Sequence, residues 1–209
     1  MIDIAYYPGC SLKGMAGEYD RSSRIVCRHL GINLREIKGW NCCGATSAHS
    51  LNHGLDVTLS ARNLDLVREM NLDHVTSPCP GCFSRMKGSW FEMKNNPAVR
   101  EKVEEILGKS APIEPEISSL LQLLATKKSI GEIAQSVVRP LTGLKVAVYY
   151  GCLLTRPKQL TEFDDPEQPM SLDRIMSSLG AEPVMWGCKA ECCGGGYSVS
   201  ETDIVLDLS

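Results

Sequence analysis

Cysteines in three short stretches of the first half of the chain have the type and spacing to do chemistry. The stretches contain, in order, Cys10, the adjacent pair Cys42 and Cys43 followed by Gly44, and the Cys-x-x-Cys sequence of Cys79 and Cys82. Later in the chain the pattern begins again with Cys152, Cys192 and Cys193. Closely spaced thiolates of this kind hold a soft metal or carry out thiol redox chemistry.

Iron–sulfur clusters are the first interpretation of these cysteines. Thiolates are the usual ligands of such clusters, and four of them suffice for a cubane cluster. Five cysteines, two of them adjacent, exceed that need, which favours a bridging thiolate or a split, distorted cluster. Zinc remains an alternative, although it commonly takes two Cys-x-x-Cys pairs, and thiol–disulfide exchange remains another.

The composition indicates an ordinary globular protein. The 209 residues are 43% hydrophobic and 22% charged, which suits one medium domain or two small ones. The net charge of −3 gives no support to nucleic-acid binding. The N-terminus lacks the features of a signal peptide, and no apolar run is long enough to span a membrane, so a cytoplasmic protein is expected. Ten cysteines in a reducing compartment indicate metal binding or catalysis.

The elements around the first cysteines alternate between strand and helix. The apolar pattern predicts strands over 2–9, 32–37 and 74–77, and helices over 16–30 and 47–70. Ile25, Val26 and Leu30 are expected to form the apolar face of the first helix. Each cysteine stretch follows a strand. This alternation predicts an α/β fold with a parallel sheet, in which ligands gather at the carboxyl ends of the strands.

An internal repeat organises the rest of the chain. Residues 83–138 are expected to form a helical connector, and 139–143 a linker. The segment 146–152 then matches 4–10 position by position, a helix ends at Gly180, and a strand is expected at 184–186. The period is about 142–150 residues.

We therefore predict a first domain over 1–139, connector included, and a second over 140–209. The Cys-x-x-Cys that would complete the second copy falls beyond residue 209, so the chain is expected to be a fragment or a truncated form.

Three stretches of the chain resemble the motifs of the cysteine-rich CCG domain: Tyr7-Pro8-Gly9-Cys10, Asn41-Cys42-Cys43-Gly44-Ala45 and Ser77-Pro78-Cys79-Pro80-Gly81-Cys82. With the repeat, nearly the whole chain resembles the B subunits of heterodisulfide reductases. The resemblance implies two pseudo-repeated CCG domains, each a small parallel sheet with flanking helices, joined by a helical segment.

The same resemblance implies a cofactor, a substrate and partners. In that family a noncubane 4Fe–4S cluster would be held by Cys10, Cys42, Cys43, Cys79 and Cys82, and a second, partly ligated one by Cys152, Cys192 and Cys193. The clusters reduce the mixed disulfide of coenzyme M and coenzyme B in methanogenic energy metabolism. Electrons arrive from an iron–sulfur protein with cubane clusters, the C-type partner, which is fed by a flavin-containing protein, the A-type partner.

Two other functions stay open. The chain would otherwise be an electron-transfer subunit, like the CCG-bearing parts of lactate, glycolate or succinate oxidation systems. The third hypothesis is a zinc-held structural module, which stoichiometric zinc without acid-labile sulfide would identify.

Several other residues could serve these sites. Cys27 is expected in the core, and Cys188 near the second site without binding metal. His49 and His53 lie on one helix face, where hydrogen bonding is favoured over zinc binding or proton transfer. The remaining candidates are cations for an anionic substrate and aromatic residues that would shield the cysteine loops, namely Lys38, Arg156, Lys189, Trp40 and Trp186.

Overall fold

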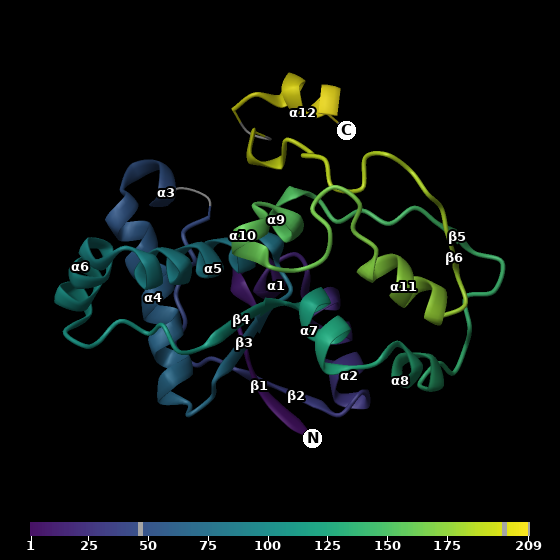
Figure 1. Cartoon of the computed structure of the whole chain (residues 1–209), viewed down its shortest axis with the longest axis horizontal. Coiled ribbons are helices and arrows are strands. Elements are labelled where there is room, and N and C mark those ends of the chain that lie inside the picture. Colours follow the sequence, from purple (N-terminus) through teal and green to yellow (C-terminus); the bar gives the residue numbers. More distant parts are fainter. Residues whose placement is uncertain (46–47, 198–199, 209) are drawn as a thin grey trace. The chain divides into compact units, whose positions relative to one another are not determined.

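The chain forms two units, Met1–Glu132 and Ile133–Ser209, in a computed structural model that describes residues 1–45, 48–197 and 200–208 (Figure 1). The first unit contains, in order, β1 (Ile2–Tyr6), α1 (Gly9–Lys13), α2 (Gly17–His29), β2 (Ile32–Glu36), α3 (Ala48–Leu51), α4 (His53–Glu69), β3 (His74–Ser77), α5 (Pro80–Asn95), α6 (Pro97–Leu107), β4 (Glu116–Ser119) and α7 (Leu120–Lys127). Helix α8 (Ile130–Gln135) contains the boundary. The second unit contains β5 (Lys145–Val146), α9 (Cys152–Thr155), α10 (Lys158–Thr161), α11 (Ser171–Ser178), β6 (Glu182–Pro183), the 3-10 turn Gly195–Tyr197 and α12 (Thr202–Leu208).

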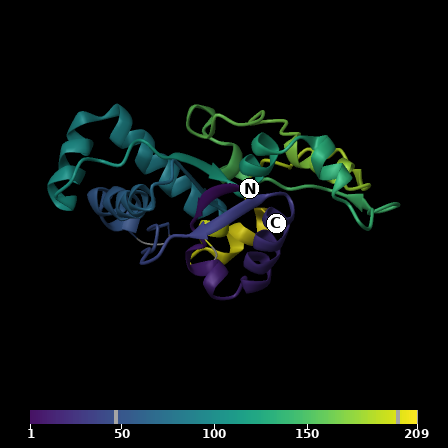
Figure 2. The same ribbon diagram turned by 90° about the horizontal axis from the view of Figure 1, so that it is seen from below.

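A parallel four-stranded sheet forms the centre of the first unit. The strand order is β2-β1-β3-β4, and every neighbouring pair is parallel. Figures 1 and 2 show α4, α5 and α6 grouped on one side of this sheet. Residues of β1, β2, α2 and α7 form a buried hydrophobic cluster in the same unit. Its members are Ile4, Cys27, Ile32, Leu120 and Leu123. The predicted α/β fold with a parallel sheet is confirmed.

The buried face of α2 differs from the prediction. Ile25 and Val26 are 59% and 47% exposed, whereas Ser23 and Cys27 are buried. Ser23 and Cys27 are four residues apart and therefore share a helix face, which turns Ile25 away from the sheet. Two small side chains on the inner face let α2 lie close to the strands, which the apolar count alone did not indicate. Cys27 lies in the core, as predicted.

The helix predicted over 47–70 is broken at Asn52. The side chain of Asn52 accepts a hydrogen bond from the amide of Leu55 at 2.9 Å, so it caps α4 and separates it from α3. Ser47, the predicted first residue, lies outside the described residues. The first strand is also shorter than expected and ends at Tyr6.

The connector contains a strand that the sequence did not predict. Within 83–138, the helices α6 and α7 appear as expected, but Glu116–Ser119 forms β4 and pairs with β3 from His74↔Glu116 to Ser77↔Ser119. This segment is short and has no clear alternation, so its strand conformation comes from pairing with a buried neighbour. Ser119 then starts α7 with a capping box to Gln122.

The second unit repeats the start of the first on a smaller scale. Strands β5 and β6 form a two-stranded parallel sheet, with Lys145 opposite Glu182, and α11 lies between them in sequence. The strand expected at 184–186 is wrong in position, because β6 covers Glu182–Pro183 instead, although the amide of Val184 still donates to the carbonyl of Val146 at 2.8 Å. Within the described residues, no helix is long and apolar enough to cross a membrane.

Stability at low pH is expected to depend on His74 in β3. This residue is 3% exposed, and its Nε2 lies 2.8 Å from Ser118 Oγ. Burial lowers the pKa of His74, while the unfolded chain keeps a value of about 6.5. As the pH falls below that value the unfolded state takes up a proton that the folded state resists, so stability is lost with a slope of up to about 1.4 kcal/mol per pH unit.

We expect the His74→Gln protein to lack this component of the pH dependence. Urea unfolding at pH 7.5 and pH 5.5 measures it, because wild type should lose about 1 kcal/mol more than the variant over this interval. Equal losses would show that His74 does not resist protonation in the fold.

Candidate metal centre

The five cysteines of the first unit that were predicted as cluster ligands all follow strands at one edge of the sheet. Cys10 lies in α1 just after β1, and Cys42 and Cys43 follow β2. Cys79 precedes α5 as its N-cap residue, and Cys82 lies in the first turn of that helix. Since β1, β2 and β3 are parallel neighbours, their carboxyl ends bring these three stretches together.

Three of the sulfur atoms form a contact group. Cys43 Sγ and Cys82 Sγ lie 3.3 Å apart, and both side chains are buried. Cys82 also hydrogen-bonds with Cys79, and these two interactions raise the pKa of Cys82. The hydrogen bond with Cys82 lowers the pKa of Cys43 to about 7 and that of Cys79 to about 6. The group therefore favours thiolates at Cys43 and Cys79, which is the ligand form of cysteine.

Tyr7 lies close both to this contact group and to the two remaining cysteines, Cys10 and Cys42. Its side chain is fully buried, and burial is the main cause that raises the pKa of its hydroxyl. The charges of four nearby cysteines raise it further, in the order Cys43, Cys82, Cys42 and Cys10. Cys10 and Cys42 are themselves exposed, so the site has a buried part and a part that solvent can reach.

The donor set fits a group with several iron atoms. It consists of soft sulfur atoms, which bind iron and form iron–sulfur clusters. Among residues 1–45, 48–197 and 200–208, no three His, Cys, Asp or Glu side chains are arranged to hold one metal ion.

The second unit places its cysteines in a similar way. Cys152 begins α9 after β5, and a hydrogen bond and the charge of Cys192 contribute, after burial, to raising its pKa. Cys193 and Cys192 also raise the pKa of Tyr149, to about 12, with burial as the larger cause. Cys192 and Cys193 are exposed, and so is Cys188.

A tyrosine hydrogen bond that sequence reasoning missed occurs in both units. The hydroxyl of Tyr7 donates to the carbonyl of Asn41 at 2.7 Å, and that of Tyr149 donates to the carbonyl of Glu191 at 2.7 Å. Each acceptor is the residue just before the adjacent cysteines. The repeated Tyr-x-Gly-Cys spacing was the available signal, since it places one tyrosine before each first cysteine.

Lys189 is a structural residue, which corrects its prediction as a substrate-binding cation. Its side chain is fully buried, and its ammonium donates to Asp173 Oδ1 at 2.7 Å and to the carbonyl of Pro169 at 3.1 Å. Arg156 pairs with Glu167 at 2.7 Å on the surface. Lys38 is exposed and lines a pocket of about 520 Å³ with Trp40, so it stays a candidate for an anionic substrate.

The aromatic and histidine candidates have ordinary partners. Trp40 lies edge-on to Tyr7 with ring centroids 5.4 Å apart, and Trp186 packs near Tyr149 at 6.2 Å, so both lie against cysteine loops. His53 Nε2 lies 2.8 Å from Glu92 Oε2, which agrees with the hydrogen-bonding interpretation. The side chain of His49 lies outside the described part of the chain.

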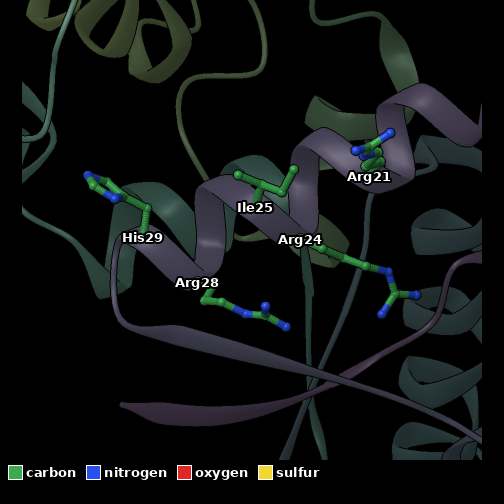
Figure 3. A pocket seen from close by; sticks show the side chains of 5 residues that line it. All are labelled: Arg21, Arg24, Ile25, Arg28 and His29. Atoms are coloured by element: carbon green, nitrogen blue, oxygen red, sulfur yellow. The ribbon is translucent and has the colours of Figure 1, made fainter.

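A basic pocket lies on α2, apart from the predicted site residues. Figure 3 shows its lining, which comes from one helix: Arg21, Arg24, Ile25, Arg28 and His29. Arg24 is already engaged, because it forms ion pairs with Asp20 and Glu36. None of the predicted cysteines lines this pocket.

A side chain at position 9 is expected to disturb the cysteine contact group. Gly9 has φ +70°, and a Cβ there would lie 2.8 Å from Cys82 Sγ. The Gly9→Ala protein should therefore lose bound iron by at least about tenfold, in addition to about 1–2 kcal/mol of backbone strain. Gly108→Ala is the matched control, since Gly108 has φ +65° with no atom within 4 Å of its added Cβ. Equal iron in both proteins would contradict the expectation.

The chain is similar to several known proteins. The family described as Cysteine-rich domain (CCG) matches residues 4–87 and 146–208. The membrane anchor subunit of the 8-methylmenaquinol:fumarate reductase of Wolinella succinogenes is 35% identical over 195 residues, which is 92% of this chain and 67% of that protein. The B subunit of the ferredoxin/F(420)H(2)-dependent CoB-CoM heterodisulfide reductase of Methanosarcina acetivorans is 25% identical, over 95% of this chain and 67% of that protein. An Archaeoglobus profundus protein described as similar to the heterodisulfide reductase B subunits is 27% identical, over 94% and 67%.

A solved structure supports the fold. The crystal structure of a hypothetical protein from Helicobacter pylori superposes with a TM-score of 0.71 at 13% identity, covering 95% of this chain and 36% of that one. The relatives support iron–sulfur oxidoreductase chemistry within a multi-subunit complex. With both of its cysteine-bearing segments matched, the chain belongs to the family of cysteine-rich (CCG) domain proteins.

Proposed function

We propose that the chain is an electron-transferring subunit that holds a noncubane 4Fe–4S cluster on Cys10, Cys42, Cys43, Cys79 and Cys82. The observation that carries this proposal is the sulfur group of Cys43, Cys79 and Cys82, with Cys10 and Cys42 close to the same tyrosine. A second cluster would use Cys152, Cys192 and Cys193.

The residues around the site would control access to the cluster. Cys43 and Cys82 are buried, whereas Cys10 and Cys42 are exposed, so a small molecule or a partner protein would approach from the side of the latter pair. Tyr7 and Trp40 lie together beside the loop and exclude water from the inner sulfur atoms. When bound, the cluster would supply single electrons.

The first candidate reaction is reduction of the coenzyme M–coenzyme B disulfide or a related disulfide. One S–S bond breaks, two electrons and two protons are consumed, and two thiols form. The heterodisulfide reductase relatives support this candidate. The electrons would come from a partner with cubane iron–sulfur clusters (C type) and, through it, from a flavin-containing partner (A type).

The second candidate is electron transfer between a quinol and a fumarate reductase. The 35% identity with the Wolinella protein favours it, because the heterodisulfide reductase relatives are 25–27% identical. In this case the chain would pass electrons between its partners without acting on a disulfide.

A paired assay separates the two candidates. The iron-loaded protein is mixed anaerobically with reduced viologen dye and the coenzyme M–coenzyme B disulfide, and separately with 8-methylmenaquinol and an oxidised dye. Disulfide-dependent dye oxidation that falls at least about tenfold in Cys82→Ser supports the first candidate. Quinol-dependent dye reduction with the same loss supports the second. Zinc without acid-labile sulfide in the purified protein would contradict the whole proposal.

A further inference from the structure

We propose that Asn63 is a positioning residue that fixes the main chain just before Cys42 and thereby aims the adjacent cysteines at their cluster. This inference rests on the proposed function, because it assumes that Cys42 and Cys43 are ligands. It assigns a task to a side chain of α4 that belongs to no cysteine motif and that carries no charge.

Asn63 forms two hydrogen bonds with the main chain of Asn41, and we call this pair of hydrogen bonds the clamp. Its side chain is fully buried in α4. Its Oδ1 accepts a hydrogen bond from the amide of Asn41 at 2.9 Å, and its Nδ2 donates to the carbonyl of Asn41 at 3.0 Å. One side-chain amide thus satisfies both main-chain polar groups of one loop residue. Asn41 is partly buried, and an unpaired main-chain group is costly to bury, so this residue needs such partners.

Tyr7, Leu59 and Arg62 also form hydrogen bonds with Asn41. The hydroxyl of Tyr7 donates to the carbonyl of Asn41 at 2.7 Å. The side-chain amide of Asn41 donates to the carbonyl of Leu59 at 3.0 Å, and Arg62 Nη1 donates to Asn41 Oδ1 at 2.7 Å. The peptide unit after Asn41 is planar, so a fixed carbonyl also fixes the amide of Cys42 and the direction in which the chain enters the cysteine pair.

The second unit shows which part of this arrangement is specific to the first. The tyrosine bond recurs there between Tyr149 and the carbonyl of Glu191. Residues 133–209 contain no asparagine, so the side-chain clamp has no asparagine equivalent. We therefore expect loss of Asn63 to affect the first site alone.

Leu64 offers a matched control for a merely structural role. It is the next residue of α4 and is also fully buried, but its apolar side chain cannot hydrogen-bond to the loop. Asn63→Leu removes the clamp and keeps the branched shape and the number of side-chain heavy atoms. Leu64→Ala removes packing from the same turn of the same helix. A general loss of stability should therefore look alike in the two proteins, whereas a change in cysteine position should appear only in the first.

The test compares wild type, Asn63→Leu and Leu64→Ala, with Asn63→Asp and Tyr7→Phe as milder variants. Hydrogen exchange of the Asn41 amide is measured in the full chain, and iron content and the electron paramagnetic resonance spectrum are measured after loading with iron and sulfide. In Asn63→Leu, we expect exchange at Asn41 to accelerate by at least about tenfold and iron affinity to fall by about 10–100-fold. The cluster that remains should give a changed spectrum.

The milder variants keep the inference falsifiable if Asn63→Leu fails to fold. Asn63→Asp keeps the acceptor for the Asn41 amide but turns its second oxygen toward the Asn41 carbonyl, so it should keep more exchange protection than Asn63→Leu while still losing part of the iron. Tyr7→Phe removes only one donor and should change the spectrum less than Asn63→Leu.

Wild-type iron content and spectrum in Asn63→Leu, or equal spectral changes in Leu64→Ala, would overturn the inference. Iron-free wild-type protein would contradict the proposed function instead, and would leave the exchange result at Asn41 to report on the clamp alone.

Discussion

Cys82→Ser should remove the iron of the first unit. Cys82 interacts with two other cysteines, Cys43 and Cys79, so its replacement takes away a proposed ligand and the interactions that join the other two. Serine is a hard oxygen ligand and a poor substitute for a thiolate at iron. Iron and acid-labile sulfide per chain should fall to less than about half of wild type, with the remainder in the second unit. Chemical analysis of anaerobically purified protein measures both.

Cys27→Ala is the control for this experiment. Cys27 is fully buried in the same unit, and burial raises the pKa of its thiol to about 11, so it stays a protonated core residue. Its truncation should cost about 1 kcal/mol of stability and leave the iron content unchanged. Equal iron loss in the two proteins would show that folding of the unit, rather than ligation by Cys82, decides the iron content.

Lys189→Met should destabilise the second unit by about 3–5 kcal/mol, because it leaves a buried carboxylate without its partner. The side chains of Lys189 and Asp173 are 0% and 3% exposed, and their charged atoms lie 2.7 Å apart. Asp173 also accepts a hydrogen bond from the hydroxyl of Tyr150 at 2.8 Å, so the pair is part of a buried network. Urea unfolding followed by the fluorescence of Trp186, the tryptophan of this unit, measures the loss.

Two further variants test the cause of that loss. Adding Asp173→Asn to Lys189→Met removes the unpaired charge and keeps an acceptor for Tyr150, so about half of the stability should return. Arg156→Gln breaks the surface pair with Glu167 and should cost less than about 1 kcal/mol. Similar losses of stability in Arg156→Gln and Lys189→Met would mean that burial does not determine how much the Lys189–Asp173 pair contributes to the free energy of unfolding.

Alternation of strand and helix was readable from the sequence because each element carries its own local pattern. Strands at 32–37 and 74–77 and the helix ending near Leu30 all appear in the structure with small shifts at their ends. The strand β4 was missed, since Glu116–Ser119 is short and owes its conformation to pairing with β3. The buried face of α2 was wrongly assigned, because Ser23 and Cys27 face the core in place of larger apolar residues.

The sequence by itself determined that cysteines follow three strands, that the sheet is parallel and that the pattern repeats, because the strand-end cysteines and the repeated Tyr-x-Gly-Cys pattern can be read without knowledge of long-range contacts. Only the tertiary structure decided how those loops are held. The clamp of Asn63 on Asn41, the tyrosine bonds to the residues before each cysteine pair, and the burial of Lys189 against Asp173 join positions far apart in the chain. Such contacts depend on which helix faces pack on the sheet, and that choice is made by the packing of the whole unit.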